Sequence, residues 1–328
     1  MNRLHIIIFI IALNTFCNAS SPNILLIVSE DNGPELGCYG APVKTPNIDK
    51  LAASGTLFEN AYVPQAGCSQ SRAALLTGLY PHQNGQIGLA TWNYEMYSEK
   101  IPNIVNTLKD GGYHTGIIGK LHIKPKSAFR FDYKEIPKSN FQRNNPELYR
   151  KKASEFFNSS KRPFYLQVNY PDAHRPFIPQ VNGIPEKPLK ASDVPALPYI
   201  GIDHPEIRQQ TADYYNCIMR LDHYIGELIN ALKKSGKFDN TVIIYIGDQC
   251  CPAVKEFFEC YRSEQYMIWN DTTIKNFLKM IPGFYDHWPG GHVDISSGLL
   301  STTNCAKQEG GGGACLLRYP STLLGMFV

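Results

Sequence analysis

The chain lacks three features that would each have indicated a different class of protein. Its 32 Lys and Arg residues nearly balance 29 Asp and Glu residues, and the net charge of +3 over 328 residues is too small to indicate binding to nucleic acid or to a membrane surface. No internal repeat is evident. After the N-terminus, no apolar run is long enough to cross a bilayer. A hydrophobic content of 43% and an aromatic content of 12% instead favour a globular enzyme with a large core.

The first 19 residues have the pattern of a secretory signal peptide. A basic start at Arg3 is followed by an apolar stretch over residues 4–16 and by the small residue Ala19, as at a cleavage site. The apolar stretch is too short for a membrane anchor. We therefore expect a mature chain without a membrane span in the secretory pathway, in the lysosome or outside the cell. N-x-[ST] sequons at Asn158 and Asn270 then predict a glycoprotein.

A cysteine and an arginine mark the start of a predicted helix. The loop-like residues 60–67 precede Cys68, and small apolar residues follow Arg72. Unpaired N–H groups and the helix dipole favour an anion at such a position, and Arg72 adds a positive charge one turn later. A random cysteine–arginine pair at this spacing is more often a core thiol and a surface charge. The functional interpretation is a reactive group that faces an oxyanion substrate.

Two acidic residues follow the first predicted strand. The continuous apolar run at residues 23–28 ends before Glu30 and Asp31, as in a buried parallel strand that presents ligands at its carboxyl end. Adjacent carboxylates repel each other unless a cation or protons lie between them, and hard oxygen ligands suit Ca²⁺. On these residues alone, a solvated acidic turn is equally compatible.

Alternating strands and helices predict an α/β fold with a mostly parallel sheet sandwiched by helices. Polar residues again follow the strands: Lys120 and His122 after one, His174 after the next, and Asp248 and Gln249 after the last. Besides the helix at Cys68, the predicted helices are 45–55, 101–109 and 205–234, and the later strands are 113–118, 163–170 and 241–246.

Three motifs in order resemble those of the type I sulfatases. Cys68–Gly78 is similar to the signature in which C-x-P-S-R precedes a short helix and T-G. Ser29–Gly33 resembles the acidic metal-binding segment, and Gly116–His122 resembles the G-K-x-H segment. The resemblance covers roughly residues 22–249 and is closest to heparan N-sulfatase-like members. It implies the alkaline-phosphatase-like fold and a hydrolase that acts on sulfuric ester or S–N bonds.

The resemblance also implies a role for each catalytic candidate. Cys68 would be oxidised to formylglycine by the formylglycine-generating enzyme, and Arg72 would stabilise an ionised hydroxyl on that group. Lys120 would neutralise the sulfate, and His122 would hydrogen-bond the nucleophile. His174 would protonate the leaving group, since histidine titrates near neutral pH.

The implied metal is Ca²⁺, bound by Glu30, Asp31, Cys68, Asp248 and Gln249. Glu30 stands where the family has an aspartate, and Gln249 stands where it has an asparagine. The implied substrate is a sulfated sugar or glycosaminoglycan, with N-sulfoglucosamine of heparan sulfate as one candidate. The sequence does not separate N-sulfated from O-sulfated substrates, and a homodimer is compatible with the family.

The sequence departs from the family pattern at Gln70 and after Gln249. Proline is expected at position 70, and its absence loosens the segment that the modifying enzyme reads. We therefore expect incomplete conversion of Cys68. Five cysteines lie in residues 250–328, where the C-terminal subdomain looks missing or replaced. The expected organisation is a signal peptide at 1–19, a catalytic domain at 20–249 and a divergent tail at 250–328.

Two other functions compete with an active sulfatase. A phosphatase or phosphodiesterase of the same fold would place serine or threonine at Cys68 and would need more histidine and aspartate for a zinc pair. A catalytically impaired binder of sulfated glycans is favoured by Gln70 and by the divergent tail. Release of sulfate from a sulfated substrate separates an active enzyme from a binder.

Overall fold

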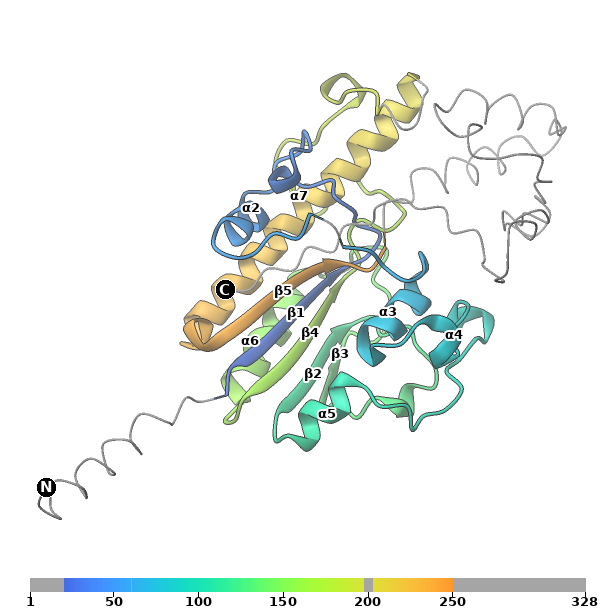
Figure 1. The fold of residues 1–328 in the computed structure, drawn as a ribbon. Helices are drawn as coiled ribbons and strands as arrows, with labels where there is room; N and C mark the ends of the chain where they lie inside the picture. Colours follow the sequence, from blue (N-terminus) through green and yellow to red (C-terminus); the bar gives the residue numbers. More distant parts are fainter. Residues whose placement is uncertain (1–20, 60, 198–202, 250–328) are drawn as a thin grey trace, which may run out of the picture.

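A computed structural model describes residues 21–59, 61–197 and 203–249. Its centre is a five-stranded sheet with the order β3-β2-β4-β1-β5, in which every strand pair is parallel (Figure 1). The strands are β1 (Asn23–Ser29), β2 (His114–Gly119), β3 (Tyr133–Glu135), β4 (Phe164–Tyr170) and β5 (Thr241–Gly247).

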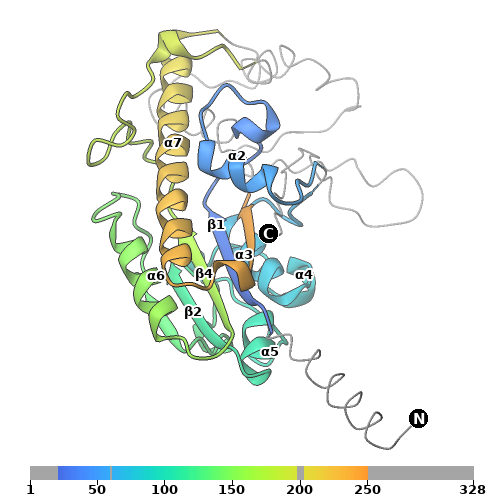
Figure 2. The same ribbon diagram turned by 90° about the vertical axis from the view of Figure 1, so that its left-hand side faces the viewer.

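Helices cover both faces of this sheet. The α-helices are α2 (Pro46–Ala53), α3 (Cys68–Thr77), α4 (Pro81–Asn84), α5 (Ile104–Asp110), α6 (Leu148–Ser159) and α7 (Pro205–Lys234). Short 3-10 helices lie at η1 (Gly37–Tyr39), η2 (Ala90–Trp92), η3 (Lys126–Ala128), η4 (Ala191–Asp193) and η5 (Phe238–Asn240). Figure 2 shows α6 and α7 on one side of the strands and α3, α4 and α5 on the other.

The two layers of core follow from the alternation of side chains along each strand. Leu25 and Ile27 of β1 pack into the core beneath α2, α6 and α7. Leu26 and Val28 point the other way, into the core beneath α3 and α5. Because both faces of β1 are covered, its sequence is a continuous apolar run rather than an alternating one.

The sheet register brings the carboxyl ends of three strands level with one another. Ser29 pairs with Tyr170 of β4 and with Gly247 of β5. The N–H of Glu30 then donates to the carbonyl of Tyr170 (3.1 Å), and the N–H of Asp248 donates to the carbonyl of Ser29 (2.9 Å). The polar residues that follow these strands therefore meet at one edge of the sheet.

Each helix and strand expected from the sequence is present, with its ends shifted by a few residues, and α4, α6, β3 and the 3-10 helices are additional elements. The signal peptide, the tail at 250–328 and the sequon at Asn270 lie outside the described residues. Asn158 is exposed near the end of α6. Within the described part of the chain, no helix is long and apolar enough to cross a membrane.

Candidate active site

The nucleophile candidate occupies the first position of α3. Gly67 precedes the helix in an extended conformation, and the N–H of Ser71 donates to the carbonyl of Gly67 (2.9 Å) as the first helical bond. Cys68 is only 7% exposed. Burial and the neighbouring Asp248 carboxylate raise the pKa of its thiol. An unmodified Cys68 is therefore a protonated thiol and a poor nucleophile at neutral pH.

Arg72 ties α3 to three strand ends. Its Nε donates to Asp248 Oδ2 (3.0 Å), and its Nη1 donates to the carbonyl of Lys120 (2.9 Å) and to Asn169 Oδ1 (2.7 Å). Burial opposes the charge, but Asp248 and Glu30 outweigh it and raise the pKa of Arg72. Nη2 is buried and has no partner among the described residues. A buried guanidinium with a spare N–H group is suited to binding an oxyanion.

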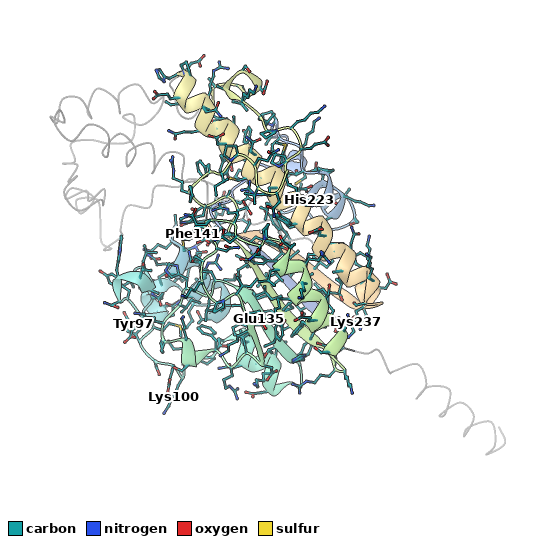
Figure 3. All side chains as sticks on the ribbon, turned by 180° about the vertical axis from the view of Figure 1, so that it is seen from behind. Tyr97, Lys100, Glu135, Phe141, His223 and Lys237 are labelled. Atoms are coloured by element: carbon teal, nitrogen blue, oxygen red, sulfur yellow. The ribbon has the colours of Figure 1, made fainter. Side chains whose placement is uncertain are left out.

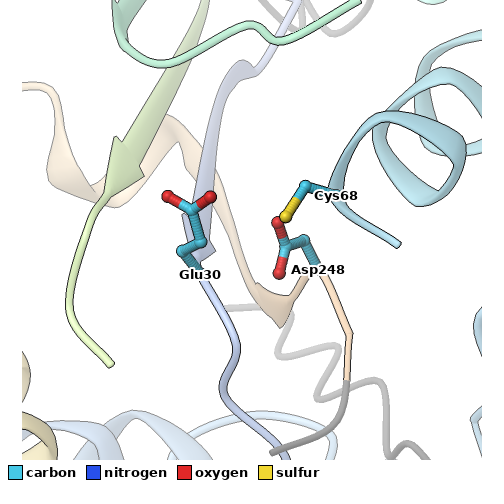
Figure 4. Close-up of side chains that lie close together, drawn as sticks. All are labelled: Glu30, Cys68 and Asp248. Carbon is cyan, nitrogen blue, oxygen red and sulfur yellow. The ribbon is translucent and has the colours of Figure 1, made fainter. Parts of the chain in front are cut away.

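Three carboxylates converge beside the thiol. Ligand atoms of Glu30, Cys68 and Asp248 lie within 4.8 Å of one another, and Figure 4 shows these three side chains coming from the end of β1, the start of α3 and the end of β5. The Asp31 N–H donates to Asp248 Oδ1 (2.9 Å). Burial and the charges of Asp248 and Glu30 raise the pKa of Asp31 to about 7. The cluster therefore holds more negative charge than the protein alone neutralises.

Two polar side chains partly compensate this charge. Lys120 Nζ forms an ion pair with Glu30; although burial raises the pKa of Glu30, Lys120 and Arg72 together lower it. Gln249 Nε2 donates to Asp31 Oδ1 and to Cys68 Sγ, the latter at 3.4 Å. Its amide group thus lies in the cluster with its nitrogen turned toward Asp31.

The donor set fits the calcium ion expected from the sequence. Carboxylates that lie close together repel each other, and this repulsion raises the pKa of Asp31. A hard divalent cation bound by their oxygens would offset the repulsion. Glu30, Asp31 and Asp248 would hold the ion beside position 68. Gln249 would join them if its amide turned to present its oxygen. The two cations nearest the cluster, Lys120 and Arg72, already neutralise part of its charge, so the site does not depend on the metal alone.

His174 reaches the same cluster from the loop after β4. Its Nε2 lies 3.8 Å from Asp31 Oδ2, and its Nδ1 donates to the Arg175 carbonyl (2.6 Å). The Phe141 ring stacks on the imidazole with centroids 3.9 Å apart, and Lys120 Nζ lies 5.1 Å above the same ring. Burial lowers the pKa of His174 despite the charge of Glu30. The imidazole is therefore neutral at pH 7, with Nε2 as an acceptor.

His122 lies near these residues but forms no hydrogen bond to Cys68. Both of its ring nitrogens are buried and lack partners among the described residues, and burial lowers its pKa to about 4, with Lys120 contributing. Its backbone is left-handed, with φ of 56°, and so is that of Asp31, with φ of 53°. Such strained residues are concentrated at functional sites.

The glycine before Lys120 is required by close packing of two strands. Gly119 has φ of 93°, and a Cβ there would lie 2.3 Å from the Asn169 carbonyl oxygen. This contact explains why a glycine precedes the lysine in the G-K-x-H segment.

A buried charge network behind His174 was missed by sequence reasoning. Asp172 Oδ1 accepts from Arg143 Nε (3.2 Å) and from Arg220 Nε (3.1 Å). Arg143 also donates to the carbonyls of Pro171 (3.2 Å) and His174. All three charged side chains are at most 2% exposed. The network holds the loop that carries His174.

Comparison with known proteins agrees with this geometry. The sulfatase family model matches residues 22–304, which covers most of the chain. The chain belongs to the sulfatase family. The match continues past Gln249, so the predicted boundary between residues 249 and 250 stays a prediction.

The relatives that the chain matches include sulfatases named for sugar sulfates. Human N-sulphoglucosamine sulphohydrolase is 33% identical over 260 residues, which are 72% of this chain and 52% of that protein. N-acetylgalactosamine-6-O-sulfatase of Bacteroides thetaiotaomicron is 27% identical, and the alignment covers 70% of this chain and 59% of that protein. The chain thus spans little more than half the length of these relatives.

A solved structure confirms the expected fold. A structural-genomics target from Bacteroides fragilis superposes with a TM-score of 0.61 at 26% identity and covers 71% of this chain and 63% of its own. Together with the parallel sheet flanked by helices on both faces, this similarity confirms the alkaline-phosphatase-like fold of the sulfatases. The C-terminal part of the predicted fold lies outside the described residues.

Proposed function

We propose that this sulfatase-family chain hydrolyses a sulfate ester or sulfamate on a sulfated sugar, with N-sulfoglucosamine of heparan sulfate as the first candidate. The observation that carries the proposal is the convergence of Cys68, Arg72 and three carboxylates at one edge of the sheet. The similarity to human N-sulphoglucosamine sulphohydrolase supports the choice of substrate.

The chemistry needs two groups that the chain acquires after synthesis. A formylglycine at position 68, made from Cys68, would supply a hydrated aldehyde whose hydroxyl attacks sulfur. A calcium ion held by Glu30, Asp31, Asp248 and Gln249 would supply positive charge for the sulfate oxygens. The buried, protonated state of the thiol supports the need for the first of these groups.

The chain's own cations bind and orient the sulfate. Arg72 has a buried Nη2 without a partner among the described residues, so an anion beside Cys68 would complete its hydrogen bonds. Lys120 pairs with Glu30 and would share its charge with an incoming sulfate. Fixed cations in a buried site stabilise developing negative charge more strongly than they would in water.

His174 is the proposed acid for the leaving group, and His122 is proposed to contact the nucleophile. Nδ1 of His174 is held by the Arg175 carbonyl, so a proton for the leaving oxygen or nitrogen must come from Nε2. That nitrogen is unprotonated in the neutral imidazole. A dianionic transition state beside it would raise the pKa of His174 and favour its protonation.

We further propose that residues 20–249 carry this chemistry after removal of residues 1–19 in the secretory pathway. Asn158 is exposed and accessible for glycosylation. The formylglycine-generating enzyme would act on the chain before folding buries Cys68.

The test is sulfate release by the full chain made together with the formylglycine-generating enzyme. The Gln70→Pro form is used because its modification is expected to be more complete, and Cys68→Ala is the control. We expect sulfate from N-sulfoglucosamine or from an O-sulfated glucosamine, and none from the control. If Gln70→Pro protein with a verified aldehyde releases no sulfate from either sugar, the proposal is wrong.

A glycan binder without catalysis is the second candidate. It is favoured by Gln70, whose side chain is buried in the first turn of α3 and donates weakly to the Ile87 carbonyl (3.4 Å). If natural protein binds a sulfated oligosaccharide but retains an unmodified thiol at position 68, this function is correct.

A further inference from the structure

A cavity of about 370 Å³ lies next to the proposed active site, at the carboxyl ends of β2 and β3. Its floor is apolar and includes Ile117 and Phe129, and Lys120 and His122 line it where it meets the site. A volume of this size falls in the range of small-ligand pockets. The cavity can accommodate one sugar ring with a charged substituent.

Three further lysines line the cavity: Lys124, Lys126 and Lys134. Lys124 Nζ donates to Asn93 Oδ1 (2.9 Å), a neutral amide that orients the ammonium group without cancelling its charge. Within the described residues, Lys126 and Lys134 form no ion pair with a carboxylate. Like charges that face one concave surface raise its potential and attract anions.

The acidic residue of the lining does not cancel this charge. Glu135 lines the cavity and is labelled in Figure 3. Its Oε1 forms an ion pair with Lys152 Nζ at 3.3 Å, and Lys152, which belongs to α6 outside the lining, also pairs with Glu155 Oε2 at 3.0 Å. One carboxylate stands against three lysines in the lining and cannot cancel their combined charge. The cavity thus keeps a positive excess.

The cavity adjoins the place where the reacting sulfate would bind. Ala90 lines it, and the Ala90 N–H donates to Ser69 Oγ (2.9 Å), one residue after Cys68. Lys120 contributes to both the cavity and the carboxylate cluster. A sugar whose sulfate lies at Cys68 would therefore place a neighbouring substituent near the lysines.

We propose that this cavity binds a second anionic group, a sulfate or a carboxylate, carried by the same sugar chain as the reacting sulfate. The inference rests on the proposed function, because it assigns the substrate class of the same site: polyanionic oligosaccharides rather than singly sulfated sugars. Lysine ammonium groups act as point charges and lack the planar fork of arginine. The lysines of the cavity can therefore bind either a sulfate or a carboxylate, and the ligands chosen for the test distinguish these two anions.

The test measures binding of a heparin-derived tetrasaccharide to the full chain by calorimetry. The double variant Lys126→Ala/Lys134→Ala removes two cavity charges. Lys151→Ala/Lys161→Ala removes two exposed charges outside the lining and is the matched control. We expect the cavity variant to bind about tenfold more weakly, with a reduced salt dependence, and the control to bind as the natural chain does.

Modified ligands identify the anion and separate this inference from the proposed catalysis. If the natural chain and the cavity variant bind a carboxyl-reduced tetrasaccharide with the same affinity, the cavity binds the carboxylate. If they bind an O-desulfated tetrasaccharide with the same affinity, the cavity binds a sulfate. Equal weakening by both double variants, or none by the cavity variant, would overturn the inference even where N-sulfoglucosamine is hydrolysed. Selective weakening in a chain that has a verified aldehyde at position 68 but releases no sulfate would support the cavity and reject the catalysis.

Discussion

Asp31 makes the metal-free protein sensitive to pH. Its carboxyl group is buried beside Asp248 and Glu30, and its native-state pKa of about 7 compares with an ordinary value of 3.8. A group with a raised carboxyl pKa binds its proton more tightly in the folded chain than in the unfolded one. The folded state therefore loses stability as pH rises from about 4 to about 7.

The magnitude follows from the two pKa values. Between them, the native state holds one proton at Asp31 that the unfolded state has released, so the free energy of unfolding falls by about 1.4 kcal/mol per pH unit. Over the whole interval this contribution is at most about 4 kcal/mol. Asp31→Asn removes the titrating group. Compared with the natural chain at the same pH, the metal-free variant should therefore have a higher free energy of unfolding at pH 8 than it has, by the same comparison, at pH 5.

The assay is urea unfolding of the full chain in a calcium chelator at pH 5 and pH 8, with Asp110→Asn at an exposed ion pair as the control. The measured quantity is the pH-dependent difference in free energy of unfolding between each variant and the natural chain. Parallel pH profiles for natural chain and Asp31→Asn would refute the reasoning.

Added calcium should stabilise the folded chain through the same carboxylates whose mutual repulsion destabilises the metal-free chain. An ion that binds only the folded state at a thousand times its dissociation constant should stabilise the natural chain by about 4 kcal/mol. Asp31→Asn should weaken this effect more than Gln249→Ala, because it removes a full charge. A melting temperature unchanged by calcium or chelator would show that the cluster holds no metal.

Three further changes test the framework of the site. Asp172→Asn leaves two buried arginines uncompensated and should cost about 3–5 kcal/mol in urea unfolding, against about 1 kcal/mol or less for exposed Asp110→Asn; equal costs would contradict the network. Gly119→Ala should destabilise the chain more than Gly112→Ala, because both have positive φ but only the first meets a backbone oxygen; similar melting temperatures would argue against the close contact. Gln70→Pro should raise the aldehyde fraction at position 68 in peptide mass spectrometry; near-complete aldehyde in the natural chain would show that glutamine suffices.

The fold was predictable because β1, β2, β4 and β5 are largely buried on both faces, whereas the short edge strand β3, which was not predicted, is not. A short continuous apolar run such as residues 23–28 is typical of a strand that is covered on both faces. The helices between such strands then indicate a parallel sheet. Helix α6 was missed although its sequence carries the signal: its buried residues Tyr149, Ala153, Phe156 and Phe157 recur at helical spacing. It is stabilised by aromatic residues such as Phe156 and Phe157, which are fully buried against the sheet.

The residues placed in the site by sequence follow strand ends, except for Cys68 and Arg72, which lie at the start of α3. Glu30 and Asp248 meet because the strand register requires it, and a parallel sheet makes that expectation general. Phe141 and Arg143 could not be found in this way. They reach His174 from a loop between β3 and α6, and no local pattern encodes a contact across some 30 residues of chain.

The conformation of residue 70 indicates that Gln70 affects the modification of Cys68 and not the folding of the site. Gln70 lies in the first turn of α3, where backbone N–H groups have no helical acceptor, so proline at this position would remove no helical hydrogen bond. The folded structure therefore does not require glutamine there, and the consequence of Gln70 falls on the unfolded segment that the modifying enzyme reads. A chain can then keep the carboxylates, Arg72 and His174 in place while its thiol stays protonated. Whether it hydrolyses sulfate or only binds it depends on the modification of Cys68.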